Sequence, residues 1–358
     1  MESYSYSIPK TLSENSQYLL KILSIKKFSI KQRIRTYYLI KMYLQNHHIK
    51  TNECLKKIEK GSAIYSILQD RELLEDSSDY IYSIGDNNLL ILVKQIGTES
   101  VNGIIFKVVG NIDYSFEKSI IISCKIMRQD EDNKKEIKIL NLLTQQILDK
   151  KNIHFPISYF SSLCKEPHGE FSHYPELTET NNYYINLNEI ADGDVSDLLE
   201  NKEKKNKEFY NNLIAQIIIT IFSFHKLGYT HNDTHCGNFL YHIITKSNSH
   251  FEYNILSNNY YIKNIGFLIV LWDFATSEKY YEDDYYKDYI KIFESIIYIV
   301  NEDGAMNHDI LFLDGIISYL KENTNGTEEN FIKFILTLNI FNNTKLNDSI
   351  NLNRIIKL

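Results

Sequence analysis

The sequence predicts an α+β fold, because a block of strand-like segments lies between segments whose apolar residues have helical spacing. From residue 12 to residue 74, apolar side chains recur at intervals of three and four, as on one face of a helix. Short β-rich runs separated by polar turns then follow at 80–84, 89–96, 103–109 and 120–127. Helical spacing returns at 213–227 and again after residue 285.

The composition is that of a globular protein with a sizeable core. Of 358 residues, 43% are hydrophobic and 24% are charged, and the net charge of -7 argues against a general nucleic-acid-binding surface. No apolar run reaches the length of a membrane span, and the polar opening at residues 1–4 does not resemble a signal peptide. Four cysteines without C-x-x-C spacing indicate neither a zinc ribbon nor a disulfide framework. We therefore expect an intracellular, cytoplasmic protein that binds neither nucleic acid nor membranes.

The first helical region is also the most basic part of the chain. Its basic residues include Lys26, Lys27, Lys31, Arg33, Arg35 and Lys41. Such a run is usually a solvated helical face, and the alternative is a docking surface for an acidic partner. Residues 1–78 are accordingly expected to form an N-terminal helical extension.

A lysine in the last β-rich run would ordinarily face water, but the helical segment that follows supplies a carboxylate as a possible partner. Lys125 lies within the strand-like segment 121–127. The helical segment after it carries Glu136 on the same face as Leu140, Leu143 and Ile147, so the acid lies at the edge of a buried stripe. Glu131 is the alternative partner for the lysine.

Three further segments read as turns and loops. Gly97 and Gly103 lie at the two ends of the segment between two β-rich runs. This arrangement by itself predicts a β-hairpin with a long turn. Residues 161–182 are polar and contain two of the four prolines, which predicts an exposed insertion. Residues 245–266 are polar and tyrosine-rich, and their pattern is typical of a β-hairpin.

The polar loop at 231–240 carries the strongest chemical signal in the chain. It lies between the apolar helical run 213–227 and a short apolar run at 239–244, so rigid elements hold it on both sides. Within it, Asp233 can orient an attacking hydroxyl, and Asn238 can hold a magnesium ion on nucleotide phosphates. Downstream, a strand-like apolar run at 269–272 ends in Asp273, which can hold the same metal from the other side.

Two plainer interpretations of the loop stay open. His231, His235 and Cys236 could belong to a zinc site, although no second cluster supplies the remaining ligands. Asp233 and Asn238 could instead be capping residues, since Asx side chains stabilise turns in many proteins.

Taken in order, these segments resemble the protein-kinase-like superfamily. The loop matches its H-x-D-x-x-x-x-N pattern, Asp273 and Phe274 match the start of D-F-G, and the segment ending at Lys125 resembles V-A-I-K. The residues that flank these motifs are most similar to those of divergent serine/threonine protein kinases of giant DNA viruses of the mimivirus type. The resemblance covers roughly residues 90–290.

The resemblance implies a two-lobed fold and a set of roles. A small antiparallel β lobe with one helix would occupy 79–190, and a larger, mainly helical lobe would occupy 191–358. The expected ligands are ATP and Mg²⁺. If the protein is viral, the resemblance places it in the host cytoplasm or in the virion. The implied roles are phosphate contact by Gly97, Gly103 and Lys125, support of that lysine by Glu136, adenine binding near Glu189 and Ala191, metal binding by Asn238 and Asp273, and catalysis by Asp233 and His235.

The chain also departs from the family pattern. Glu99 stands where the phosphate loop has its middle glycine, Ala275 replaces the glycine of D-F-G, and Asn232 replaces the arginine of H-R-D. His235 replaces a lysine, as in kinases of the aminoglycoside and choline types, and no A-P-E follows. We expect an ATP- and magnesium-dependent kinase acting on protein hydroxyls. The alternatives are a small-molecule phosphotransferase and an inactive pseudokinase that serves as a binding module.

Overall fold

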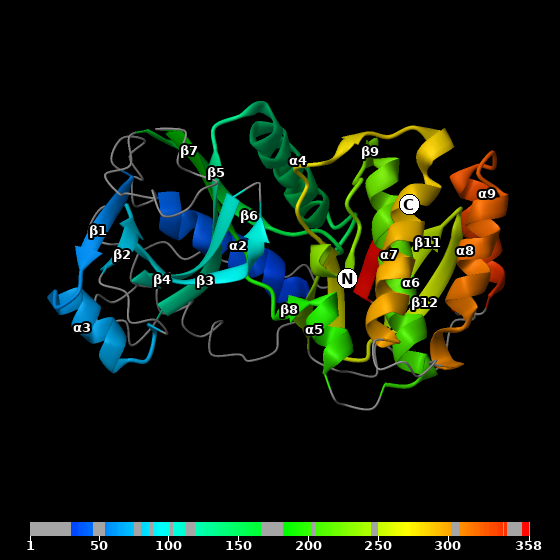
Figure 1. Ribbon diagram of the computed structural model, residues 1–358, viewed down its shortest axis with the longest axis horizontal. Helices are drawn as coiled ribbons and strands as arrows, with labels where there is room; N and C mark the ends of the chain where they lie inside the picture. The colour runs from blue at the N-terminus through cyan, green and yellow to red at the C-terminus, as the bar shows by residue number, and fades with distance from the viewer. Residues whose placement is uncertain are drawn as a thin grey trace, which may run out of the picture. The chain divides into compact units, whose positions relative to one another are not determined.

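The computed structural model shown in Figure 1 divides into two compact units, each described here by itself. Unit 1 comprises Met1–Lys138 and Ile157–Ile190, and unit 2 comprises Ile139–Pro156 and Ala191–Leu358. The structure describes residues 30–45, 54–74, 80–85, 89–100, 103–111, 119–165, 182–201, 205–244, 250–301, 308–338, 340–341 and 353–357. The domain boundaries expected after residues 78 and 190 stay a prediction.

Unit 1 is built on a seven-stranded antiparallel sheet (Figure 1). Across the sheet the strands are β1 (Leu55–Glu59), β2 (Tyr80–Ile84), β3 (Leu90–Ser100), β4 (Gly103–Asn111), β5 (Ser119–Arg128), β7 (Asn182–Asn188) and β6 (Ser158–Lys165). The four β-rich runs expected from the sequence are β2 to β5. The α+β class is therefore confirmed, and β3 and β4 form the expected hairpin.

Two strands correct the sequence expectations. β1 lies in the region expected to be helical, where Leu55 and Ile58 share the helical spacing of three but pair instead with β2. Both side chains are buried, and on a strand an odd spacing directs them to opposite faces. β6 covers residues 161–165, which were expected to belong to an exposed insertion; β7 pairs with it and Cys164 is buried. Residues 166–181 lie outside the described part of the chain.

Unit 1 also contains the helices α2 (Ile30–Gln45) and α3 (Ala63–Asp70) and the first part of α4 (Glu131–Leu148), which continues into unit 2 from Ile139. Residues 12–29 of the expected helical extension lie outside the described residues. Ser62 caps the N-terminus of α3, because its side chain accepts the Tyr65 N–H. Leu68 of α3 is buried and packs in one cluster with residues of β1 to β4. Asp130 accepts the Asn133 N–H at 2.8 Å and so fixes the start of α4.

Arg33 on α2 is not part of a solvated face. It is 2% exposed, and its Nε donates to Glu189 Oε2 at 3.0 Å while Nη2 donates to Oε1. Lys41 on the same helix donates to the Tyr37 hydroxyl at 2.8 Å. The solvated-face interpretation is therefore wrong at Arg33, because an acid of the same chain neutralises it. Lys26 and Lys27 lie outside the described residues.

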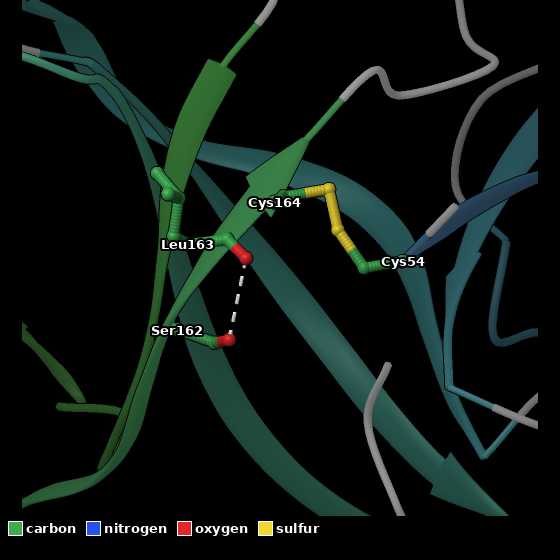
Figure 2. The surroundings of a disulfide bond; sticks show 4 residues. All are labelled: Cys54, Ser162, Leu163 and Cys164. Carbon is green, nitrogen blue, oxygen red and sulfur yellow. Dashed lines mark hydrogen bonds between the residues drawn. A yellow bond between two sulfur atoms is a disulfide. The ribbon is translucent and has the colours of Figure 1, made fainter. Parts of the chain in front are cut away.

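A disulfide joins Cys54 and Cys164, as Figure 2 shows. Cys54 precedes β1 and Cys164 lies in β6, so the bond links the two edge strands of the sheet. Their Cα atoms are 5.7 Å apart, within the range that disulfides require. The expectation of no disulfide is thus wrong for this pair, since 110 residues separate the cysteines in sequence and only the sheet order brings them together.

Unit 2 combines helices with small sheets (Figure 1). Its helices include α5 (Val195–Glu200), α6 (Lys207–Lys226), α7 (Tyr286–Val300), α8 (Phe312–Glu322) and α9 (Glu328–Thr337). Its strands include β8 (Gly193–Asp194), β9 (Tyr229–Thr230), β10 (Phe239–Ile243), β11 (His250–Ile255), β12 (Asn258–Lys263), β13 (Phe267–Leu271), β14 (Glu278–Lys279) and β15 (Asn353–Lys357). The expected hairpin at 245–266 is present as β11 and β12.

α6 is the central helix of unit 2, with every residue from Leu213 to His225 buried. Its polar side chains are satisfied inside: Gln216 Oε1 accepts the Ile269 N–H at 2.9 Å, and Thr220 donates to the Gln216 carbonyl at 2.7 Å. Across the described ranges, no helix combines the length and apolar character needed to cross a membrane.

Candidate active site

The polar loop at 231–240 is held between buried elements, as the sequence predicts. α6 ends at Lys226, and Gly228, with φ of +89°, turns the chain into the short strand β9. Within the loop, a single turn of 3₁₀ helix at Cys236–Asn238 leads directly into β10. β10 pairs antiparallel with β13, so the loop that leads into β10 and the Asp273 segment that follows β13 lie at the same end of the two strands.

One face of α7 holds the backbone of this loop. Asp288 accepts the N–H of His231 at 2.7 Å and the N–H of Asn232 at 2.9 Å. Seven residues further along α7, and so on the same face, the Ser295 hydroxyl accepts the Cys236 N–H at 3.1 Å. The sequence interpretation missed Asp288; its signal is a buried acid beside Tyr289 in an otherwise apolar stripe.

Asp233, the expected base, is held from two sides. Its Oδ1 accepts from Lys291 Nζ at 2.5 Å, and its Oδ2 accepts from Asn238 Nδ2 at 3.3 Å. The side chain is 36% exposed, so it remains accessible to a substrate hydroxyl. Lys291 was not recognised from the sequence, because a lysine on an exposed helix position carries no distinctive pattern.

Asn238 and Asp273, the expected metal ligands, lie on bonded segments. The Asn238 side-chain amide donates to the Asp233 backbone carbonyl at 2.8 Å, and the backbone carbonyl of Asn238 accepts the Trp272 N–H at 2.9 Å. Asp273 follows Trp272 directly and has φ of +60°, a left-handed conformation that Asp tolerates better than most residues. The buried strand that precedes it is β13, as predicted.

The side chains of Asn238 and Asp273 carry oxygen atoms of the kind that bind a magnesium ion. Because Nδ2 of Asn238 is committed to Asp233, its Oδ1 is the atom left to bind a ligand, and within the described residues it accepts no hydrogen bond. Amide and carboxylate oxygens are the ligands that Mg²⁺ takes. Asn238 and Asp273 would therefore hold the ion within unit 2.

His231 is a buried structural residue rather than a metal ligand. Its Nε2 donates to the Trp272 carbonyl at 2.8 Å, and its Nδ1 accepts the Asp233 N–H at 3.3 Å, which fixes the tautomer. Burial lowers the pKa of His231, although Asp288 and the Trp272 carbonyl oppose the effect, so the ring stays neutral. Both ring nitrogens of His231 are already hydrogen-bonded, so neither is available to bind zinc. In the described ranges, no group of three His, Cys, Asp or Glu side chains could hold a metal ion.

His235 caps the turn that follows it. Its Nδ1 accepts the Gly237 N–H at 3.2 Å, and its Nε2 lies 3.7 Å from Asp233 Oδ2. The imidazole is therefore oriented by its own loop.

Behind the loop, His225 forms a buried ion cluster with two acids. Its Nε2 lies 3.0 Å from Asp288 Oδ2, and its Nδ1 lies 2.7 Å from Glu328 Oε1 on α9. Burial alone lowers the pKa of His225, but Glu328 and Asp288 outweigh it and raise the pKa to about 9. Burial likewise opposes ionisation of Asp288, yet the hydrogen bond and charge of His225 lower its pKa. The loop is thus tied to a charged His225.

A cavity in unit 2 lies over this cluster and not over Asp233. His225, Tyr280 and Glu328 contribute to its lining. The Tyr280 hydroxyl donates to Glu328 at 3.1 Å, and burial together with Glu328 raises the pKa of Tyr280, so the phenol stays protonated. Every polar group named here is already paired, so the cavity belongs to the support of the loop.

In unit 1, the expected ion pair between Lys125 and Glu136 is present. Lys125 Nζ lies 2.8 Å and 2.9 Å from the two carboxylate oxygens, and the side chains are 1% and 0% exposed. The alternative partner, Glu131, is exposed and pairs with Lys134 instead.

Of the remaining expected site residues, Gly97, Gly103 and Glu189 lie in unit 1 and Ala191 lies in unit 2. Gly97 is exposed with φ of +78°, and Gly103 has φ of +142°, where an added Cβ would come within 2.5 Å of the Ile126 carbonyl oxygen. The Glu189 carboxylate binds Arg33 and the Ile157 N–H, and its backbone N–H donates to the Ile157 carbonyl at 2.9 Å. Ala191 begins the second part of unit 2.

Comparison of the chain with protein-family models finds no match, and comparison with curated proteins finds none.

Proposed function

We propose that the protein is an ATP- and magnesium-dependent phosphotransferase with a protein-kinase-like architecture that transfers phosphate to a protein hydroxyl. One observation carries the proposal: Asp233, Asn238 and the segment of Asp273 are bonded to one another in the order and chemistry that phosphoryl transfer needs. The buried pair of Lys125 and Glu136 in unit 1 supports it, since a lysine held by a glutamate is a phosphate-binding device.

Each residue of the loop site has a separate role in the proposed transfer. Asp233 accepts the proton of the acceptor hydroxyl, and its partial exposure suits contact with a substrate. Asn238 and Asp273 would hold the metal ion, which would neutralise charge on the phosphates. α7 keeps the loop in place through Asp288 and Ser295, so the geometry is set before substrate arrives.

A small-molecule acceptor is the second candidate, and one observation favours it. The chain between Asp273 and the first residue of α7 consists of residues 274–285 only, part of which is β14, paired with β9. So short a segment offers little surface for a peptide substrate.

Binding and turnover measurements on the full chain test the proposal. Calorimetry with ATP, with and without Mg²⁺, is followed by ATP turnover on panels of proteins and of small hydroxyl compounds such as choline and aminoglycosides. Asp233→Asn should lower turnover by about a hundredfold to ten-thousandfold while leaving ATP affinity nearly unchanged.

Asp273→Asn should abolish magnesium-dependent turnover and preserve metal-independent nucleotide binding. Asp314→Asn, an exposed acid on α8, is the matched control and should behave as wild type. A wild-type protein that binds no nucleotide refutes the proposal. One that binds nucleotide but turns over no acceptor is a pseudokinase.

A further inference from the structure

The α7 residue Lys291 makes the shortest polar contact to the expected base. Its Nζ lies 2.5 Å from Asp233 Oδ1 and 3.4 Å from the Asn232 carbonyl oxygen. An ammonium group has three donors. Two are thus directed at the loop, and within the described residues the third has no acceptor.

Lys291 belongs to the same face of α7 that holds the loop. Asp288, Lys291 and Ser295 follow one another at intervals of three and four, which places them in one row. The first and last bind loop N–H groups that are fixed parts of the fold, whereas Lys291 is 48% exposed and binds the loop's reactive carboxylate. The row therefore presents one half-exposed cation beside Asp233.

His235 is poorly placed to supply that cation. Because its Nδ1 accepts the Gly237 N–H, that nitrogen carries no proton in this arrangement. His235 Nε2 lies 3.7 Å from the Asp233 carboxylate, whereas Lys291 Nζ lies 2.5 Å from it, so Lys291 is the closer cation.

We propose that Lys291 is a catalytic residue, which donates a hydrogen bond to the transferred phosphoryl group while it orients Asp233. The inference rests on the proposed phosphotransferase function. In the transfer, the acceptor oxygen bonds to the terminal phosphorus, the bond from that phosphorus to the nucleoside diphosphate oxygen breaks, and Asp233 takes the hydroxyl proton. Lys291 keeps its own protons throughout and offsets the charge on the phosphoryl oxygens.

Three variants test this role. Lys291→Met removes the charge at nearly equal length, Lys291→Arg keeps it, and Lys287→Met is the matched control, since Lys287 lies one turn earlier on α7 and pairs with Asp284 at 2.6 Å. Lys291→Met should lower kcat by about a hundredfold to a thousandfold, with a much smaller rise in KM for ATP. Lys291→Arg should recover part of the loss, and Lys287→Met should match wild type.

Two measurements without turnover separate catalysis from folding. Calorimetry should show that Lys291→Met loses affinity for ATP relative to ADP, because only ATP carries the phosphoryl group that Lys291 contacts. Amide hydrogen exchange of residues 231–236 should be unchanged in Lys291→Met and faster in Asp288→Asn, because Asp288 holds the backbone.

The outcomes distinguish the two claims. A wild type that turns over, with Lys291→Met equally active or equally selective for ATP, overturns the role of Lys291 and leaves the proposed function intact. Faster exchange of 231–236 in Lys291→Met, to the extent seen in Asp288→Asn, makes Lys291 a structural residue instead. A wild type without nucleotide binding overturns both.

Discussion

The two units each contain a lysine bound to a carboxylate, and the pairs differ mainly in burial. In unit 1, Lys125 and Glu136 are 1% and 0% exposed and meet through both carboxylate oxygens. In unit 2, Lys291 and Asp233 are 48% and 36% exposed and meet through one oxygen. The first pair joins a central strand to a helix, and the second joins a loop to a helix.

The difference indicates two uses of the same chemistry. A buried pair is costly to break, because its charges cannot return to water, so it fixes a lysine in one place. An exposed pair contributes little to stability and exchanges its partners readily. We therefore expect the unit 1 pair to matter first for folding and the unit 2 pair to matter first for turnover.

The largest expected effect is at the buried pair. Glu136→Gln removes the negative charge that Lys125 contacts and should lower the free energy of unfolding by about 3 to 5 kcal/mol. Urea denaturation followed by circular dichroism measures it. Glu131→Gln, on the exposed face of the same helix, is the control and should leave the midpoint unchanged. A loss at Glu136 no larger than at Glu131 would break the comparison.

The buried cluster of His225 extends the comparison to unit 2 through pH. Its folded-state pKa of about 9 exceeds the ordinary value of 6.5, so protonated His225 stabilises the fold below pH 6.5 and this stabilisation is lost as pH rises through 9. The loss amounts to roughly 3 kcal/mol. The lowered pKa of Asp288 acts in the other direction, since its contribution disappears in acid.

Unfolding free energies from pH 6 to pH 10 measure this dependence. His225→Gln should be less stable than wild type near pH 6 and should approach it near pH 10. A constant difference between the two proteins across this range contradicts the charged state of His225.

Sequence patterns predicted the strands and helices whose apolar residues recur at a clear interval, and the features that depend on residues close together in the chain. β2 to β5, β13 and the stripe of Glu136, Leu140 and Leu143 follow from apolar spacing alone. Order along the chain also placed Asp233, Asn238 and Asp273 on neighbouring segments. Such features depend on periods of two or 3.6, which the sequence displays directly.

Contacts between distant segments could not be predicted in this way. Asp288 and Lys291 act across more than 50 residues, Arg33 reaches Glu189 across 156, and the cysteines of the disulfide are 110 apart. Each is an ordinary residue of its own element, and only the tertiary fold selects its partner. β1 was misread for the same reason, since pairing with β2 outweighs helical spacing.

A second buried pair in unit 1 sharpens the comparison. Arg33→Met takes the cation from Glu189, whose Oε1 still accepts the Ile157 N–H at 3.0 Å. The expected loss in unfolding free energy is therefore smaller than at Glu136, about 2 to 3 kcal/mol. Lys41→Met on the same helix removes a bond to a neutral tyrosine hydroxyl and should cost less, so the reverse order contradicts the assignment.

The smallest expected effect on stability is at the exposed pair, where a double-mutant cycle isolates the interaction. Asp233→Asn, Lys291→Met and their combination should give a coupling in unfolding free energy of about 0.2 to 1 kcal/mol, and salt should weaken it. Both charges are already hydrated in the unfolded chain and remain partly hydrated in the fold, so little is gained when they meet. The same cycle measured on turnover should show strong coupling, because Lys291 then acts on a carboxylate and a phosphoryl group at once. A coupling in stability as large as that of a buried pair would make the contact structural, and the distinction between the two units would fail at the residue on which it depends most.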